Sequence, residues 1–227
     1  MQLYIGNKNY SSWSLRPWLL MRHTGIDFDE IALRFDDFGE SSEFRRRLLA
    51  VVPVAKVPVL VDDGLAVWDT LAIAEYLAEK FAALDLWPRA RAARATARSL
   101  CAEMHAGFAA LRTHLPMNIG ASLPGIGPRL LRERADVAQD VRRIDDMWSR
   151  ALEASGGPFL FGDFGIVDAY YAPVCSRLRT YGIVPSPSAQ AYVQRMLALP
   201  AQQQWDDAAR AETDFVKDDE PYRSARA

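Results

Sequence analysis

Short apolar runs alternate with helically spaced apolar residues over the first eighty positions. Four runs look like strands, namely QLYIG, EIALRF, VPVLV and LAVW, and the last two flank Asp62-Asp63-Gly64, which is typical of a hairpin turn. Three segments have helical spacing between or after these runs: residues 14–23, 41–51 and 69–81. The order predicts β-α-β-α-β-β-α, a small sheet with helices packed on it.

Helical spacing dominates after Leu86-Trp87-Pro88, and strand signals nearly vanish. The expected helices cover residues 89–115, 129–154, 166–181, 188–199 and 202–211. We therefore expect an α/β N-terminal domain of residues 1–82 and an all-α C-terminal domain of residues 89–227. The tail after Phe215 is charged and interrupted by proline, so we expect it to be loosely held.

Composition narrows the class of protein. The chain has 227 residues and a formal net charge of −2, so no global charge draws it to nucleic acid or to an anionic membrane. No window approaches eighteen consecutive apolar residues, and the N-terminus does not resemble a signal peptide. Two distant cysteines and three histidines show no metal-ligand spacing. We expect a cytoplasmic protein with no metal site, no membrane span and no nucleic-acid partner.

The segment KVPVLVDDG followed by WDTLAIAEYL carries the first chemical signal. Pro58 at the start of a strand cannot donate to the sheet, and a cis Val57–Pro58 bond would turn the Val57 backbone outward. An extended peptide ligand pairs with such exposed backbone as an added strand. Asp69 and Thr70 then open a helix, whose N-terminus suits a carboxylate while Asp69 suits an amine. Together they suit a ligand with an α-amino acid head and a peptide middle.

Two adjacent hydroxyls, Ser11 and Ser12, precede the first helix in NYSSWSLRPWLLM. Serine favours helix starts, so these residues are either caps or groups directed at a ligand. Ser14 is the expected N-cap, with Pro17 tolerated in the first turn.

These motifs, in this order, resemble the glutathione S-transferase superfamily over about residues 1 to 212. YSSWSLRPWLL is similar to the SSCSWRVR motif of the zeta class (maleylacetoacetate isomerases), and Ser11 to Arg16 keeps the spacing of the family's catalytic serine and arginine. GDFGIVDAYYAPV resembles the S/T-I-A-D start of a family helix, with Asp168 as a structural cap, and RMLALPAQQQW resembles the closing segment. The departures are Trp13 in place of the zeta cysteine, Asp69-Thr70 in place of Glu-Ser or Gln-Ser, and Gly165 in place of Ser or Thr.

The resemblance implies a thioredoxin-like domain followed by an all-helical one, glutathione as co-substrate, and a homodimer. Ser11, with Ser12 as the alternative, would donate a hydrogen bond to the glutathione thiolate. Residues that would bind glutathione are Lys56, Val57, Pro58, Asp69 and Thr70. The second-substrate pocket would include Trp13, His105, Phe108, Met117 and Asn118, although an apolar stripe at this spacing is also typical of plain core.

The implied function is a serine-type glutathione transferase that conjugates glutathione to a small hydrophobic electrophile, as in detoxification. Two alternatives stay open, a glutathione-dependent cis-trans isomerase of the maleylacetoacetate type and a glutathione-binding module with little activity. A thiol–disulfide reductase would need a cysteine near the start of the first helix, and residues 9–16 contain none.

Overall fold

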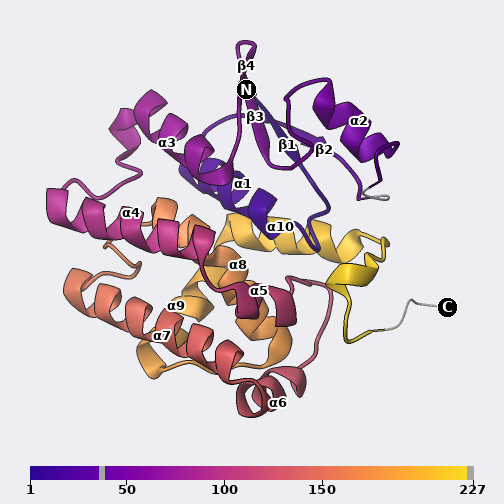
Figure 1. Cartoon of the computed structure of the whole chain (residues 1–227). Coiled ribbons are helices and arrows are strands. Elements are labelled where there is room, and N and C mark those ends of the chain that lie inside the picture. The colour runs from indigo at the N-terminus through magenta and orange to yellow at the C-terminus, as the bar shows by residue number, and fades with distance from the viewer. Residues whose placement is uncertain (36–38, 224–227) are drawn as a thin grey trace.

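The computed structural model describes residues 1–35 and 39–223, in which a small sheet with its helices lies against a larger helical layer (Figure 1). The first part has the predicted order β-α-β-α-β-β-α. Its elements are β1 (Gln2–Ile5), α1 (Ser12–Thr24), β2 (Asp29–Ala32), α2 (Glu43–Leu49), β3 (Val59–Asp62), β4 (Leu65–Val67) and α3 (Thr70–Lys80). This is the thioredoxin-like arrangement that the sequence predicts.

The sheet has strand order β2-β1-β3-β4, with β1 parallel to β2 and the other two pairs antiparallel. Because side chains alternate along a strand, the two faces serve different cores. Leu3, Ile5 and Leu60 join the large core that includes α1 and α3. Val59 packs on the other face, in a smaller cluster with residues of α2. Both faces of the sheet are therefore covered.

A series of helices forms the second part, as predicted. Its elements are η1 (Ala82–Leu84), α4 (Arg91–Ala106), α5 (Ala109–His114), α6 (Ile126–Glu133), α7 (Ala135–Ser155), α8 (Ile166–Tyr181), α9 (Pro187–Leu197), α10 (Pro200–Ala211) and η2 (Lys217–Asp219). The domain boundary at residues 82–88 stays a prediction. None of the helices in the described ranges is long and apolar enough to span a lipid bilayer.

Two long helices expected from the sequence are each broken in two. The first breaks at Gly107 and Phe108, where Phe108 has φ 54°, and the Arg112 guanidinium donates to the carbonyls of Met104 and Gly107. Those carbonyls lie in the last turn of α4 and just beyond it, where a helix lacks internal partners. The second breaks at Arg134, whose extended backbone separates α6 from α7. Periodicity alone does not detect such breaks, because the apolar spacing continues across them.

The start of α1 also differs from the prediction. The helix begins at Ser12 with Ser11 in the N-cap position, so the expected Ser14 cap is wrong. The Ser14 side chain is fully buried and accepts a hydrogen bond from the Gly6 amide at 3.1 Å. Ser14 therefore ties the helix to the end of β1.

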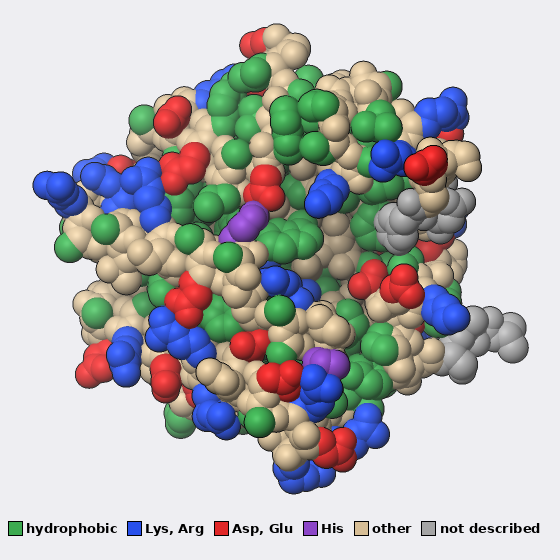
Figure 2. All heavy atoms as spheres, in the orientation of Figure 1, with side chains coloured by type: hydrophobic (Ala, Val, Ile, Leu, Met, Phe, Trp, Pro, Cys, Tyr) green, Lys and Arg blue, Asp and Glu red, His purple; other side chains and the backbone are tan. Residues whose placement is uncertain are grey.

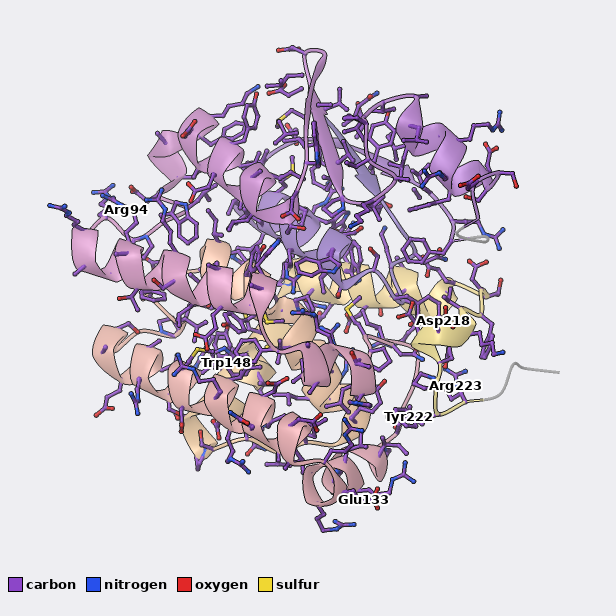
Figure 3. The ribbon with its side chains drawn as sticks, in the orientation of Figure 1. Arg94, Glu133, Trp148, Asp218, Tyr222 and Arg223 are labelled. Atoms are coloured by element: carbon purple, nitrogen blue, oxygen red, sulfur yellow. The ribbon has the colours of Figure 1, made fainter. Side chains whose placement is uncertain are left out.

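The central helix α8 is buried along almost its whole length and packs against α1, α4 and α9. Trp148 points from α7 into this interior, where it meets the rings of Tyr171 and Tyr192 (Figure 3). Asp168 caps α8 by accepting from the amides of Leu160 and Gly165, as the sequence predicts. Both cysteines are free and buried in the same core.

The segment of residues 212–223 after α10, called here the C-terminal segment, is not loosely held. Glu220 is 5% exposed and accepts from the Tyr10 hydroxyl at 2.8 Å. Tyr222 donates to the His114 carbonyl at 2.7 Å and packs on Tyr181. The expectation of a loose tail is therefore wrong up to residue 223, because aromatic and acidic residues find buried partners elsewhere. The remaining residues, 224–227, lie outside the described part.

Candidate active site

A cavity of about 530 Å³ opens where α1 begins, between the sheet part and the helical part. Figure 2 shows the molecule in the orientation of Figure 1, with hydrophobic side chains gathered over the strands and in the middle and charged ones spread over the helical half and the rim. The lining residues come from both parts of the chain: Tyr10, Ser11, Ser12, Trp13, Phe35, Phe44, Ala55, Lys56, Val57, Arg112, Pro116, Met117, Arg177 and Asp219. Residues predicted to contact glutathione and residues predicted to contact the second substrate thus line one cavity.

Ser11 and Ser12 both line the cavity, and both are mostly buried. The Ser11 Oγ lies 2.7 Å from the Ser14 Oγ, close enough for a hydrogen bond between the two hydroxyls. The amides of Trp13 and Ser14, in the first turn of α1, have no hydrogen-bond partner among the described residues. A helix N-terminus with unpaired amides carries partial positive charge, which favours an anion at this point.

Lys56 and Val57, from the segment before β3, line the same cavity. The Val57–Pro58 peptide bond is cis, as the sequence predicts. In the described part of the chain neither the amide nor the carbonyl of Val57 has a hydrogen-bond partner. An extended peptide would find one donor and one acceptor here.

Asp69 and Thr70 open α3, as the sequence predicts, but they do not line the cavity. The exposed Asp69 carboxylate accepts from the Leu71 amide at 3.0 Å, and Thr70 is buried. A short path joins them to the cavity: the His105 Nδ1 lies 3.6 Å from Asp69 Oδ1, and the His105 ring meets that of Trp13. A ligand that reached both sites would extend across this path.

The five residues predicted for the second-substrate pocket divide into two groups. Trp13 and Met117 line the cavity. His105 lies behind Trp13 and its Nδ1 is 3.1 Å from the Tyr170 hydroxyl. Phe108 and Asn118 are buried and are absent from the lining among the described residues. Their role in substrate binding stays a prediction.

Sequence reasoning missed Arg112 and Arg177, and it singled out Arg16 only through its spacing from Ser11. Arg112 and Arg177 line the cavity, and the Arg16 guanidinium stacks on Trp13 with its carbon 3.9 Å from the ring centroid. Within residues 1–35 and 39–223, no carboxylate comes within ion-pair distance of these three side chains. For Arg16 the signal was its spacing from Ser11, and for Arg112 and Arg177 the local sequence pattern gave none.

Two of these guanidinium groups are buried with unsatisfied nitrogens. Arg16 uses Nε to donate to the Tyr170 carbonyl at 2.9 Å, while its Nη1 and Nη2 have no partner among the described residues. Arg177 donates from Nε to the Leu115 carbonyl at 2.8 Å, and its Nη1 also has no partner there. Burial lowers the pKa of Arg16 to about 10, and burial together with the charge of Arg16 lowers the pKa of Arg177 to about 9. Buried unpaired cations are costly, so this cavity favours an anionic ligand.

Asp219, from the C-terminal segment, is the acid in the lining. Burial raises its pKa to about 6, while the charge of Arg177 acts in the opposite direction. Near pH 7 this carboxyl is mostly ionised and offsets one positive charge, while Lys56, Arg112 and Arg177 give the same lining three cations.

The match to known families agrees with this geometry. Residues 10–80 match the model of the glutathione S-transferase N-terminal domain, and residues 132–195 match that of the C-terminal domain. These two ranges make up more than half of the chain. The chain belongs to the glutathione S-transferase family.

The proteins that this chain is similar to carry different functional names. A probable maleylacetoacetate isomerase of Caenorhabditis elegans is 32% identical over 98 residues, which is 43% of this chain and 43% of that protein. The chain thus matches less than half the length of this relative. A stringent starvation protein A homologue of Coxiella burnetii is 26% identical over 189 residues, 83% of this chain and 81% of that protein. The structure of a glutathione transferase homologue from Burkholderia GL BGR1, with bound glutathione, has a TM-score of 0.67 at 24% identity, and covers 93% of this chain and 98% of that one.

Proposed function

We propose that this protein is a serine-type glutathione transferase, in which Ser11 stabilises the glutathione thiolate. The observation that carries the proposal is the Ser11 hydroxyl at the N-terminus of α1, in the cavity that also presents Val57. Bound glutathione supplies the sulfur nucleophile that attacks the second substrate. The chain's own residues bind it, orient it and hold its sulfur as the anion.

The hydrogen bond between Ser11 and Ser14 supports Ser11 as the donor to sulfur. Ser14 already accepts from the Gly6 amide, and its buried hydroxyl hydrogen needs an acceptor. Donation from Ser14 to the Ser11 Oγ satisfies that need and leaves the Ser11 hydrogen free to point into the cavity. No side-chain hydrogen bond to Ser12 exists among the described residues, so nothing comparable orients its hydroxyl.

The rest of the glutathione molecule matches features on the sheet side. The unpaired Val57 backbone suits the peptide middle, and Lys56 suits a terminal carboxylate. The exposed Asp69 suits the γ-glutamyl amine, and the amides of Thr70 and Ala72, unpaired in the described residues, suit its carboxylate. We propose accordingly that residues 1–82 are the glutathione-binding domain and that residues 89–227 contribute the electrophile pocket.

A carboxylate on the second substrate is favoured by Arg112 and Arg177. Hydrophobic rings of Trp13, Phe35 and Phe44 would contact a small apolar body, while the unpaired Arg177 nitrogen would bind an acid group. This observation supports the second candidate function, glutathione-dependent isomerisation of an unsaturated keto acid, beside conjugation. The third, a binding module with little activity, predicts no turnover with either type of substrate.

The test of the main proposal is a pair of variants, Ser11→Ala and Ser12→Ala. Hydrogen bonds to charged groups contribute about 1.5 to 3 kcal/mol, so Ser11→Ala should raise the pKa of bound glutathione by about one to two units. Turnover near pH 7 should fall by about tenfold to a hundredfold and recover partly at higher pH. Thiolate absorbance titrated against pH measures the shift directly.

Ser12→Ala is the matched control for that titration, because it removes a hydroxyl from the adjacent position. A shift of this pKa with Ser12→Ala alone would assign the hydrogen bond to sulfur to Ser12 instead of Ser11. No shift with either variant would reject the serine-type mechanism.

The choice of second substrate is tested with Arg177→Met, which keeps an unbranched stem and removes the guanidinium with its charge. With maleylacetone, which carries a carboxylate, we expect the KM to rise by roughly tenfold or more because a charge-assisted hydrogen bond is lost. With an uncharged chloronitrobenzene the KM should change by less than about threefold. Equal effects on both substrates would contradict a carboxylate-binding role.

A further inference from the structure

Glu212 links the C-terminal segment to the loop of residues 6–11, which joins β1 to α1. One carboxylate oxygen accepts from the Lys8 amide at 2.7 Å, and the other accepts from the Asn9 amide at 3.0 Å. The two amides are consecutive, so a single carboxylate binds both as a bidentate acceptor. Bidentate, charge-assisted hydrogen bonds fix orientation as well as distance.

The position of Glu212 in its own helix makes this arrangement informative. Glu212 is the C-cap residue of α10, where the partial negative charge of the helix disfavours an acid. Glycine, asparagine or a basic residue is the usual choice there. A residue that breaks a local rule is explained by a contact elsewhere in the fold. Here that contact is with the loop that leads to Ser11.

Two further acids of the C-terminal segment hold the same loop. Asp214 accepts from the Asn7 side chain at 2.8 Å, and its carbonyl accepts from the Tyr10 hydroxyl at 3.0 Å. The same hydroxyl lies 2.8 Å from Glu220 Oε1, so its one hydrogen is shared between these two acceptors. Burial and the Glu220 hydrogen bond raise the pKa of Tyr10 to about 12, so this hydroxyl stays protonated and keeps donating. The acids of this segment therefore contact the side chains of Asn7 and Tyr10 as well as the amides between them.

The loop passes this restraint to Ser11 through its backbone. The Asn7 carbonyl accepts from the amides of Tyr10 and Ser11, at 3.2 and 2.8 Å. A shift of residues 7–10 would therefore move Ser11 relative to Ser14, whose own position is fixed by burial and by the Gly6 amide. The hydrogen bond between the two serines depends on that relative position.

We propose that Glu212 is a positioning residue for the active site, which holds the loop of residues 6–11 so that the Ser11 hydroxyl faces the sulfur. The proposal rests on the proposed function of Ser11. Glu212, about two hundred residues from Ser11 in sequence, would thus help to position the hydroxyl that binds the thiolate.

The experiment measures the pKa of bound glutathione and the steady-state constants for Glu212→Ala. We expect the pKa to rise in the same direction as in Ser11→Ala and by no more than that variant shows. At pH 7, kcat should fall by roughly threefold to thirtyfold, while the KM for glutathione should change by less than about threefold. An unchanged pKa in a folded Glu212→Ala protein would overturn the proposal.

Two more variants separate a specific role of Glu212 from a general effect of substitution in the C-terminal segment. Glu212→Gln retains the size of the side chain but has only one acceptor oxygen for two amides, so its pKa shift should be smaller and of the same sign. It also serves if Glu212→Ala does not fold. Asp218→Ala is the matched control, because Asp218 is an exposed acid of the same segment, labelled in Figure 3, with no side-chain hydrogen bond or ion pair among the described residues. It should leave the titration unchanged, and an equal shift there would contradict a specific role of Glu212.

A double-mutant cycle separates failure of this inference from failure of the proposed function. If Glu212 acts through Ser11, adding Glu212→Ala to Ser11→Ala should produce no further pKa shift. Additive shifts would show that Glu212 acts on the thiolate by another route, and would reject the positioning role while leaving Ser11 in place. If Ser11→Ala itself produced no shift, the proposed function would fail first.

Discussion

Three serines near the start of α1 show how far single residues can be interpreted from sequence. The sequence predicts that Ser11 or Ser12 faces a ligand, and both line the cavity. It assigns the cap to Ser14, which instead bonds to Gly6, because a buried contact to β1 replaces the local cap. Arg112 and Arg177 were not predicted, since nothing in the local pattern distinguishes a cation that enters a cavity from one that lies on a solvated helix face.

Asp168 gives a prediction of pH dependence at this scale. Its buried carboxylate has a pKa raised to about 6, chiefly by burial, while hydrogen bonds from Leu160, Gly165 and Tyr192 oppose the rise. The unfolded value is about 3.9. Because the folded pKa is higher, the stability contributed by the protonated group is fully present below about pH 4 and is lost as pH rises through about 6.

The measurement compares wild type with Asp168→Asn by urea unfolding between pH 4.5 and 7.5. The variant should be less stable throughout, since an amide offers one acceptor oxygen to three donors. The difference in free energy of unfolding should shrink with rising pH, by up to about 3 kcal/mol for a shift of two units. A difference that grows with rising pH would contradict the assigned pKa direction.

At the scale of elements, the sequence predicts kinds and order better than ends. The sheet half is confirmed in order, and α3 begins at Thr70 with Asp69 as its cap, because a short side chain and a helical apolar pattern act locally. The breaks at Gly107 and Arg134 were missed, although glycine is a common helix stop. The tail after Phe215 was expected to be loose because of its charge, yet Glu220 accepts from the Tyr10 hydroxyl and Tyr222 donates to the His114 carbonyl. Those partners lie far away in the sequence, so no local pattern predicts the contacts.

At the scale of the whole molecule, two apolar surfaces support the predicted homodimer. Leu65 and Trp68, at β4 and just after it, are 53% and 41% exposed. A second cavity, of about 540 Å³, lies between α4 and α7 and is lined largely by apolar residues such as Leu100, Met147 and Phe161. A symmetric dimer would place the first surface of each copy on the helical part of the other.

The dimer prediction is tested by light scattering at micromolar concentration. Wild type should have the mass of two chains, and Trp68→Glu should shift it toward one, because a charge would be buried without a partner at the contact. Val184→Glu is the control, since Val184 is also a strongly exposed apolar residue but lies beyond α8. A monomeric wild type would reject the prediction outright.

The amino-acid sequence by itself determined the order of strands and helices, the turn at Val57–Pro58, the cap of α3 and the pair of hydroxyls at the start of α1. Each of these depends on residues within a few positions of one another, through backbone sterics, apolar spacing or a single hydrogen bond. Only the tertiary structure decided that Arg112 and Arg177 share a cavity with Ser11, that Ser14 bonds to Gly6, and that Glu212 holds the loop before the active site. These contacts join parts of the chain that meet only after the helical layer has packed on the sheet, so no local pattern records them.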